Sequence, residues 1–172
     1  MRRLFLFLFA ALISISSIAQ LAKVEKKIAS YVEANNTSAL KLLEEVVNIN
    51  SGSMNFEGVQ KVGQIFRAKL DALGFDTRWV DGKPFGRAGH LVAYHTGKGP
   101  GKTLLLIGHL DTVFEPSSTL QKYTMINDST ATGPGVSDMK GGDVIMIYSL
   151  EALKQAGLLK QMNIIPAVCI RR

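Results

Sequence analysis

The sequence contains one cysteine, Cys169, in 172 residues, which excludes a disulfide within the chain. Its stability must therefore come from packing, from a metal or from a partner chain. Its basic residues form no long block and are not interleaved with aromatic residues, although the formal net charge is +6. Nucleic-acid binding is disfavoured for that reason. With 47% hydrophobic and 20% charged residues, and no internal repeat or low-complexity tract, the composition indicates one globular domain.

The first 19 residues have the pattern of a secretory signal peptide. Arg2 and Arg3 form a basic start, residues 4–13 are apolar, and residues 17–19 end in small side chains, so we expect cleavage after Ala19. The apolar run is shorter than the about 20 residues that a membrane-spanning helix needs. The pattern predicts a secreted or periplasmic protein that is not held in a membrane after cleavage. Its formal charge is then +4, from 18 basic and 14 acidic residues.

Hydrophobic periodicity predicts an α/β fold in which helices cover a mixed sheet. Apolar residues recur at spacings of three and four through residues 59–73 and indicate a helix that ends at Gly74. The apolar run 103–107, between two glycines, predicts a strand buried on both faces. The remaining expected elements are helices over 21–34, from 37 or 38 onward and over 143–157, strands over 75–80, 89–96 and 162–165, and a hairpin around Asn127 and Asp128.

Two short motifs carry the candidate chemistry. In GHLDTV, residues 108–113, His109 and Asp111 are two apart at a strand end, so both side chains point to the same side. The ring of such a histidine can bind a metal through one nitrogen while the carboxylate accepts the other N–H. In GPGVSDMKGG, residues 133–142, glycines frame Asp138 and allow it to approach the same strand end.

Each motif by itself also fits a simpler role. A His-x-Asp pair is more often the polar start of a loop, and a glycine-rich turn before a helix often only caps that helix. The two motifs together, with a histidine, a carboxylate and a second carboxylate beside the histidine, favour a zinc site.

The same two motifs resemble the signatures of the zinc aminoacylase and carboxypeptidase superfamily, which contains glutamate carboxypeptidase, acetylornithine deacetylase and succinyl-diaminopimelate desuccinylase. The resemblance extends from the second helix to Asn163. It implies that His109 ligates one Zn²⁺, that Asp138 bridges two Zn²⁺, and that Asp111 is the catalytic residue that orients and polarises the His109 side.

The resemblance also implies a fold and a reaction. The fold is the amino-terminal half of a di-zinc exopeptidase catalytic domain. The reaction is hydrolysis of an amide bond next to a free carboxylate, in a peptide or N-acyl amino acid substrate. The resemblance is nearest to the secreted glutamate-carboxypeptidase branch, and a homodimer is possible for the complete parent enzyme.

The ligand set of this chain is too small for that site. Two four-coordinate zincs need about eight ligand positions, but the chain offers His109 and Asp138, while His90, His95 and Glu151 fit packing or surface roles. The general-base glutamate of the family is missing after the strand that starts at Asn163. We therefore expect a truncated enzyme that is inactive alone. The alternative interpretations are a non-catalytic remnant that binds a metal or a partner chain, and a chain that does not fold alone.

The expected domain organisation has three parts. Residues 1–19 are the signal peptide, residues 20–165 a partial zinc-peptidase catalytic domain, and residues 166–172 an aberrant tail. The last boundary is placed at Pro166, because proline lacks the N–H group that an internal strand donates.

Overall fold

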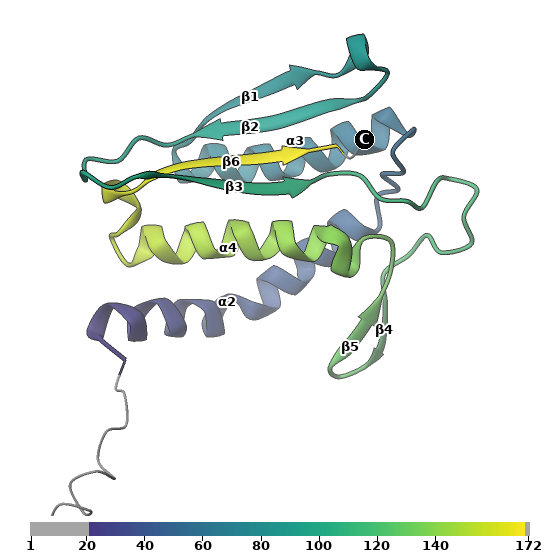
Figure 1. The fold of residues 1–172 in the computed structure, drawn as a ribbon. Coiled ribbons are helices and arrows are strands. Elements are labelled where there is room, and N and C mark those ends of the chain that lie inside the picture. The colour runs from purple at the N-terminus through teal and green to yellow at the C-terminus, as the bar shows by residue number, and fades with distance from the viewer. Residues whose placement is uncertain (1–20, 171–172) are drawn as a thin grey trace, which may run out of the picture.

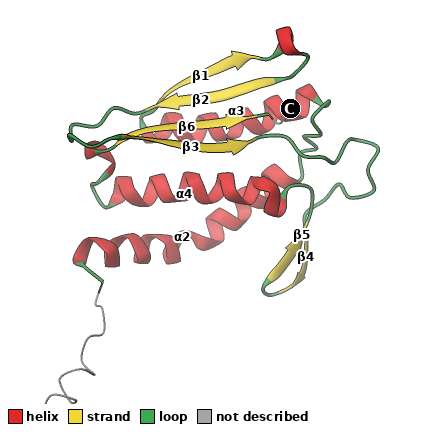
Figure 2. Cartoon of the chain, viewed as in Figure 1, coloured by secondary structure: helices red, strands yellow, loops and turns green. Residues whose placement is uncertain are grey.

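The computed structural model describes residues 21–170, so the predicted signal peptide lies outside the described part. The elements are shown in Figures 1 and 2. The helices are α2 (Lys23–Val47), α3 (Phe56–Leu73) and α4 (Gly141–Gln155), with short turns η2 (Lys83–Phe85), η3 (Val136–Lys140) and η4 (Leu159–Gln161). The strands are β1 (Asp76–Asp81), β2 (Gly89–Tyr94), β3 (Thr103–His109), β4 (Thr124–Asn127), β5 (Thr130–Thr132) and β6 (Asn163–Cys169). None of the described helices has both the length and the apolar character needed to cross a bilayer.

A four-stranded mixed sheet in the order β1-β2-β6-β3 forms the centre of the fold. β3 and β6 run parallel, whereas the other two pairs are antiparallel. Helices α3 and α4 pack on one face of the sheet, and α2 packs against α4 on the side away from it (Figure 1). The predicted α/β class with a helix-covered mixed sheet is confirmed. The predicted hairpin also forms, as β4 and β5.

Helix α3 forms where the periodicity predicts it. The side chain of Asn55 accepts a hydrogen bond from the Gly58 N–H at 3.2 Å and so caps the first turn. The helix ends at Gly74, whose φ of 92° is the left-handed cap expected there. Its apolar face is part of the core cluster, whose fully buried members include Val46, Val59, Val62, Phe66, Leu70, Leu91, Leu110 and Leu150.

The predicted break after residue 34 is wrong, because α2 is one continuous helix, Lys23–Val47. Asn35 stays within it and donates from Nδ2 to the Tyr31 carbonyl at 2.8 Å. The Tyr31 hydroxyl donates in turn to Glu151 of α4 at 3.1 Å. Packing against α4 outweighs the modest helix preference of asparagine.

The predicted interruption at Pro166 is also wrong, because β6 continues through it to Cys169. The register with β3 is unbroken, from the Thr103–Asn163 pair to the His109–Cys169 pair. On the β2 side, Ile164 exchanges two 2.9 Å hydrogen bonds with His95, so residue 166 is the next position that would donate toward β2. Proline therefore removes one hydrogen bond from the β2–β6 ladder and leaves the strand in place.

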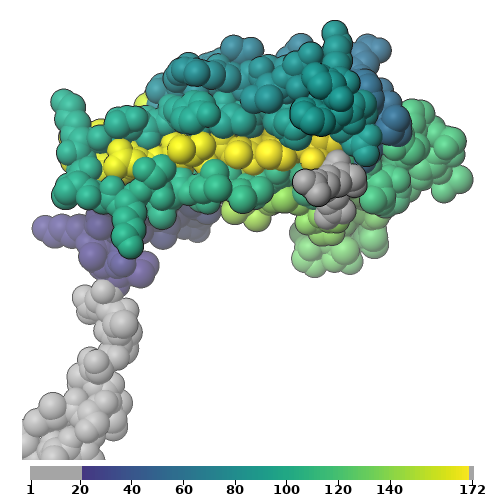
Figure 3. Space-filling model, turned by 45° about the horizontal axis from the view of Figure 1, so that its top comes forward, coloured from purple at the N-terminus to yellow at the C-terminus, as the bar shows by residue number. Residues whose placement is uncertain are grey.

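Strand β3 is not buried on both faces, contrary to the prediction, because it lies at the edge of the sheet. Leu105 is 58% exposed and Ile107 is 67% exposed. In the register these two residues stand beside Ile165 and Ala167 of β6, on the face opposite the helices. Figure 3 looks onto this open face, where β6 is the yellow band between its neighbouring strands. An apolar sheet face of this kind favours association.

We therefore expect the double substitution Leu105→Thr and Ile107→Thr to reduce self-association of the chain. Threonine is β-branched, which suits a strand, and it removes apolar surface at both positions. Sedimentation velocity at several concentrations measures the effect, with Ile145→Thr as a control because Ile145 is equally exposed, at 69%, but lies on α4. Equal association of the double variant and the wild type would contradict the expectation.

Candidate functional site

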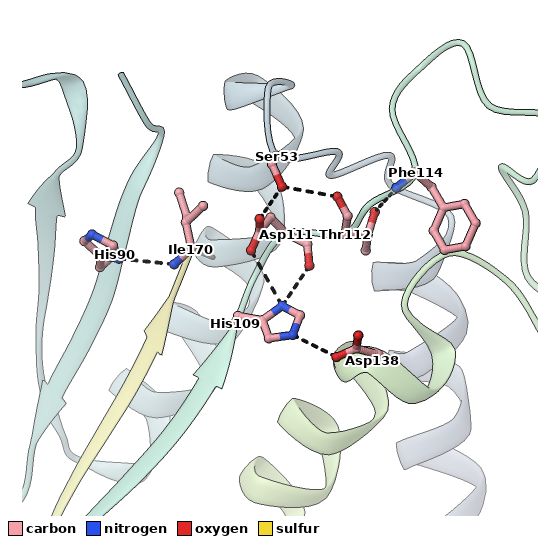
Figure 4. Close-up of polar contacts among 8 residues, drawn as sticks. All are labelled: Ser53, His90, His109, Asp111, Thr112, Phe114, Asp138 and Ile170. Atoms are coloured by element: carbon pink, nitrogen blue, oxygen red, sulfur yellow. Dashed lines mark hydrogen bonds and ion pairs between the residues drawn. The ribbon is translucent and has the colours of Figure 1, made fainter. Parts of the chain in front are cut away.

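The structure brings His109 and Asp138 together at the carboxyl end of β3 (Figure 4). His109 is the last residue of the strand, and Asp138 lies in η3, the turn that leads into α4. The ring Nε2 atom lies 3.0 Å from Oδ1 of Asp138. The two side chains come from segments 29 residues apart in the sequence, and they meet at the edge of the sheet where the motifs predict it.

The other ring nitrogen of His109 has a partner that differs from the predicted one. Nδ1 lies 2.9 Å from the backbone carbonyl oxygen of Asp111, whereas the carboxylate Oδ1 of Asp111 is 3.6 Å away. The carbonyl oxygen can only accept, so Nδ1 carries a proton and donates it. The carboxylate oxygen of Asp138 also accepts, so the 3.0 Å contact with Nε2 requires a proton or a metal ion between the two atoms.

The side chain of Asp111 is completely buried behind His109. Ser53 Oγ donates a short hydrogen bond to its Oδ2 atom. Sequence reasoning missed this contact, because Ser53 belongs to neither of the two motifs. The available signal was the buried carboxylate itself, because a carboxylate without solvent requires nearby donors.

The turn that holds Asp138 is anchored by Lys140, which is also completely buried. Its Nζ donates to the carbonyl oxygens of Val46 at 2.7 Å and of Ile49 at 2.8 Å. Burial lowers the pKa of Lys140 to about 8, and the nearby charge of Asp143 opposes this shift. Asp138 itself has φ −133° and ψ 92°, outside the helical region. In the sequence, Lys140 is recognisable only as one residue of the second motif.

A second buried acid, Asp143, lies in the first turn of α4, as the sequence predicts. Among the residues that the structure describes, neither of its carboxylate oxygens has a hydrogen-bond partner. Burial raises the pKa of Asp143 to about 8, although the Lys140 charge lowers it. A Cβ atom at Gly108 would lie only 2.0 Å from Oδ1 of Asp143, so the strand end beside His109 needs glycine at this position.

The donor set fits one edge of a metal site. An imidazole nitrogen and a carboxylate oxygen converge, and both are ligands that Zn²⁺ accepts. Within residues 21–170, however, no group of three or more His, Cys, Asp or Glu side chains is arranged to hold a metal ion. His90 and His95 lie elsewhere, where His90 Nδ1 accepts from the Ile170 N–H at 3.2 Å and His95 Nε2 lies 3.0 Å from the Leu159 carbonyl.

Comparisons with known proteins agree with the motifs. Residues 105–167 match Peptidase family M20/M25/M40. The chain is 30% identical over 152 residues to carboxypeptidase G2 of Pseudomonas sp. (strain RS-16), covering 87% of this chain and 36% of that protein. It is also 30% identical over 122 residues to succinyl-diaminopimelate desuccinylase of Buchnera aphidicola subsp. Cinara cedri (strain Cc), covering 67% of this chain and 30% of that protein.

The fold is similar to that of a solved structure, human carnosine dipeptidase 1, with a TM-score of 0.71 and 19% identity. This match covers 84% of the present chain and 34% of the other. The chain therefore spans about a third of the length of each of these proteins.

Proposed function

Because this chain carries part of a peptidase M20 family domain, we propose that His109 and Asp138 are metal ligands of a zinc-dependent amidohydrolase site. The observation that carries the proposal is the 3.0 Å approach of His109 Nε2 to Asp138 Oδ1, with Nδ1 hydrogen-bonded on the opposite side of the ring. This geometry fixes the ring and directs Nε2 toward the carboxylate, and a metal ion bound there would replace the proton between the two atoms. In the complete enzyme the substrate is a peptide or an N-acyl amino acid, cut at an amide bond next to a free carboxylate.

Each residue of this site has a separate task. His109 supplies a neutral nitrogen ligand, and the carbonyl group of Asp111 keeps its proton on Nδ1. Asp138 supplies a carboxylate that can bridge two metal ions. Two bound Zn²⁺ ions would supply Lewis-acid activation of water and of the scissile carbonyl group. The Asp111 carboxylate, 3.6 Å from Nδ1, adds negative charge behind the ring and strengthens it as a ligand.

We infer that the metal site in this polypeptide lacks some of its ligands. Structural zinc sites take four protein ligands and catalytic sites take three, whereas His109 and Asp138 provide two. We expect weak binding of at most one Zn²⁺ and no turnover by the chain alone. We also propose that the protein is secreted or periplasmic, because residues 1–19 have the pattern of a signal peptide.

Zinc titration of the purified chain tests the proposal. Isothermal calorimetry should show at most one Zn²⁺ per chain, and both His109→Ala and Asp138→Ala should weaken the affinity at least about tenfold, because each removes a ligand. Asp128→Ala is the matched control, because Asp128 is an exposed carboxylate in the β4–β5 hairpin.

The outcomes separate the two parts of the proposal. Unchanged zinc affinity in both site variants would exclude this site. Uptake of two Zn²⁺ with release of amino acids from an N-acyl substrate would instead contradict the expected inactivity of the chain.

A further inference from the structure

The loop before α3 is joined to the segment that follows β3 by backbone hydrogen bonds. The Thr112 N–H donates to the Ser51 carbonyl at 2.8 Å, and the Ser53 N–H donates to the Thr112 carbonyl at 3.1 Å. Gly52 and Thr112 form a parallel bridge between these two bonds. The backbone of Ser53 is therefore held beside Asp111 whatever its side chain does, as Figure 4 shows.

The Ser53 hydroxyl contacts Oδ2 of Asp111, the carboxylate oxygen other than the one that faces the imidazole. Its Oγ lies within short hydrogen-bond distance of Asp111 Oδ2 and at 3.4 Å from the Thr112 carbonyl. A hydroxyl has one proton, and the charged, closer acceptor takes it. With Oδ2 bound to Ser53, the other oxygen, Oδ1, faces His109 Nδ1 at 3.6 Å.

The carboxylate has little freedom to arrange itself otherwise. It is completely buried, so water does not replace a lost donor without rearrangement. Rotation of the Asp111 side chain would withdraw Oδ1 from the ring and would break the hydrogen bond from Ser53. A single hydroxyl group thus couples the loop before α3 to the orientation of the ring at the end of β3.

We propose that Ser53 is a positioning residue of the His109 site. It holds the Asp111 carboxylate so that Oδ1 lies behind the His109 ring, 3.6 Å from Nδ1, while the backbone carbonyl of the same residue accepts from Nδ1 at 2.9 Å. The consequence for zinc affinity rests on the proposed function, whereas the consequence for the ring signals does not. Threonine should substitute for Ser53 because it keeps the hydroxyl group, whereas alanine should not.

The chain contains a matched control two residues away. Ser51 is also serine and is completely buried, and its Oγ has no hydrogen-bond partner among the described residues. Ser51→Ala removes a buried hydroxyl from the same loop without removing a donor from Asp111. It should therefore reproduce any general packing effect of Ser53→Ala but none of the effect on the ring.

The experiment compares the wild-type chain with Ser53→Ala, Ser53→Thr and Ser51→Ala. Nitrogen-15 NMR of the His109 ring in the metal-free chain, at one fixed pH, reports changes in the surroundings of the two ring nitrogens. Calorimetric titration with Zn²⁺ alone reports affinity, and thermal melting reports folding. We expect Ser53→Ala to shift the ring nitrogen signals, because the charge behind the ring moves, and to bind Zn²⁺ about tenfold more weakly. Ser53→Thr and Ser51→Ala should match the wild type.

Unchanged ring signals in a folded Ser53→Ala chain would overturn the proposal. So would equal effects of Ser53→Ala and Ser51→Ala, since these would indicate packing alone. If Ser53→Ala does not melt cooperatively, Ser53→Cys, which keeps the size but donates weakly, must shift the ring signals in the same direction. A wild-type chain that takes up no Zn²⁺ would contradict the proposed function, and the NMR comparison would still decide the role of Ser53.

Discussion

Replacing Lys140 with methionine should lower the free energy of unfolding by about 3 kcal/mol. Lys140 Nζ donates to the carbonyl oxygens of Val46 and Ile49, at the carboxyl end of α2. The Val46 carbonyl is in the last turn, where the helix cannot satisfy it internally, and the Ile49 carbonyl lies just past the helix end. The negative end of the helix dipole favours a cation there. Methionine fills a similar volume but leaves both acceptors without this donor. Chemical denaturation followed by circular dichroism measures the loss.

Lys154→Met is the matched control for this prediction. Lys154 also donates to a backbone carbonyl, that of Ala72 at 2.9 Å, but it does so at the surface. Water replaces that bond when the lysine is lost, so the change should stay within about 0.5 kcal/mol. Equal destabilisation by the two variants would show that the buried position of Lys140 has no special role. Because Lys140 is two residues from Asp138, its loss should also weaken Zn²⁺ uptake.

The positions of His109 and Asp138 were predictable, because local sequence patterns mark both residues. His109 ends an apolar run, and Asp138 lies among glycines before a helix, so short motifs were enough to predict that the two side chains meet. Helix α3 and its glycine cap were predictable for the same reason, since spacing and capping are local properties.

The supporting residues were not predictable, because their roles depend on segments far apart in the chain. Ser53 contacts Asp111 across 58 residues, and Lys140 contacts Val46 across 94 residues. No local pattern distinguishes such a serine or lysine from a surface one. Tertiary packing also explains the errors, since α2 continues through Asn35 against α4, and β6 continues through Pro166 because β3 pairs with it along its whole length.

Replacing Asp143 with asparagine should stabilise the protein, and the gain should increase with pH. Burial raises the pKa of Asp143 from 3.8 to about 8. The folded chain therefore binds a proton that the unfolded chain releases between these two values. Stability falls as pH rises from about 4 to about 8, by about 1.4 kcal/mol per pH unit from this group. Asparagine has nearly the same shape and does not titrate, so the variant should lack this decrease.

The comparison is sharpest between pH 5 and pH 8. At pH 5 the wild-type side chain is a neutral acid in the folded state, and the difference in unfolding free energy between the two chains should be smallest. Between pH 5 and pH 8 the unfolding free energy of the variant should increase by about 3–4 kcal/mol relative to that of the wild type. Asp128→Asn removes the same charge from an exposed turn and should leave the pH dependence unchanged. A difference between Asp143→Asn and wild type that is constant across this range would mean that the Asp143 carboxyl group is already ionised in the folded chain, with its charge balanced by Lys140.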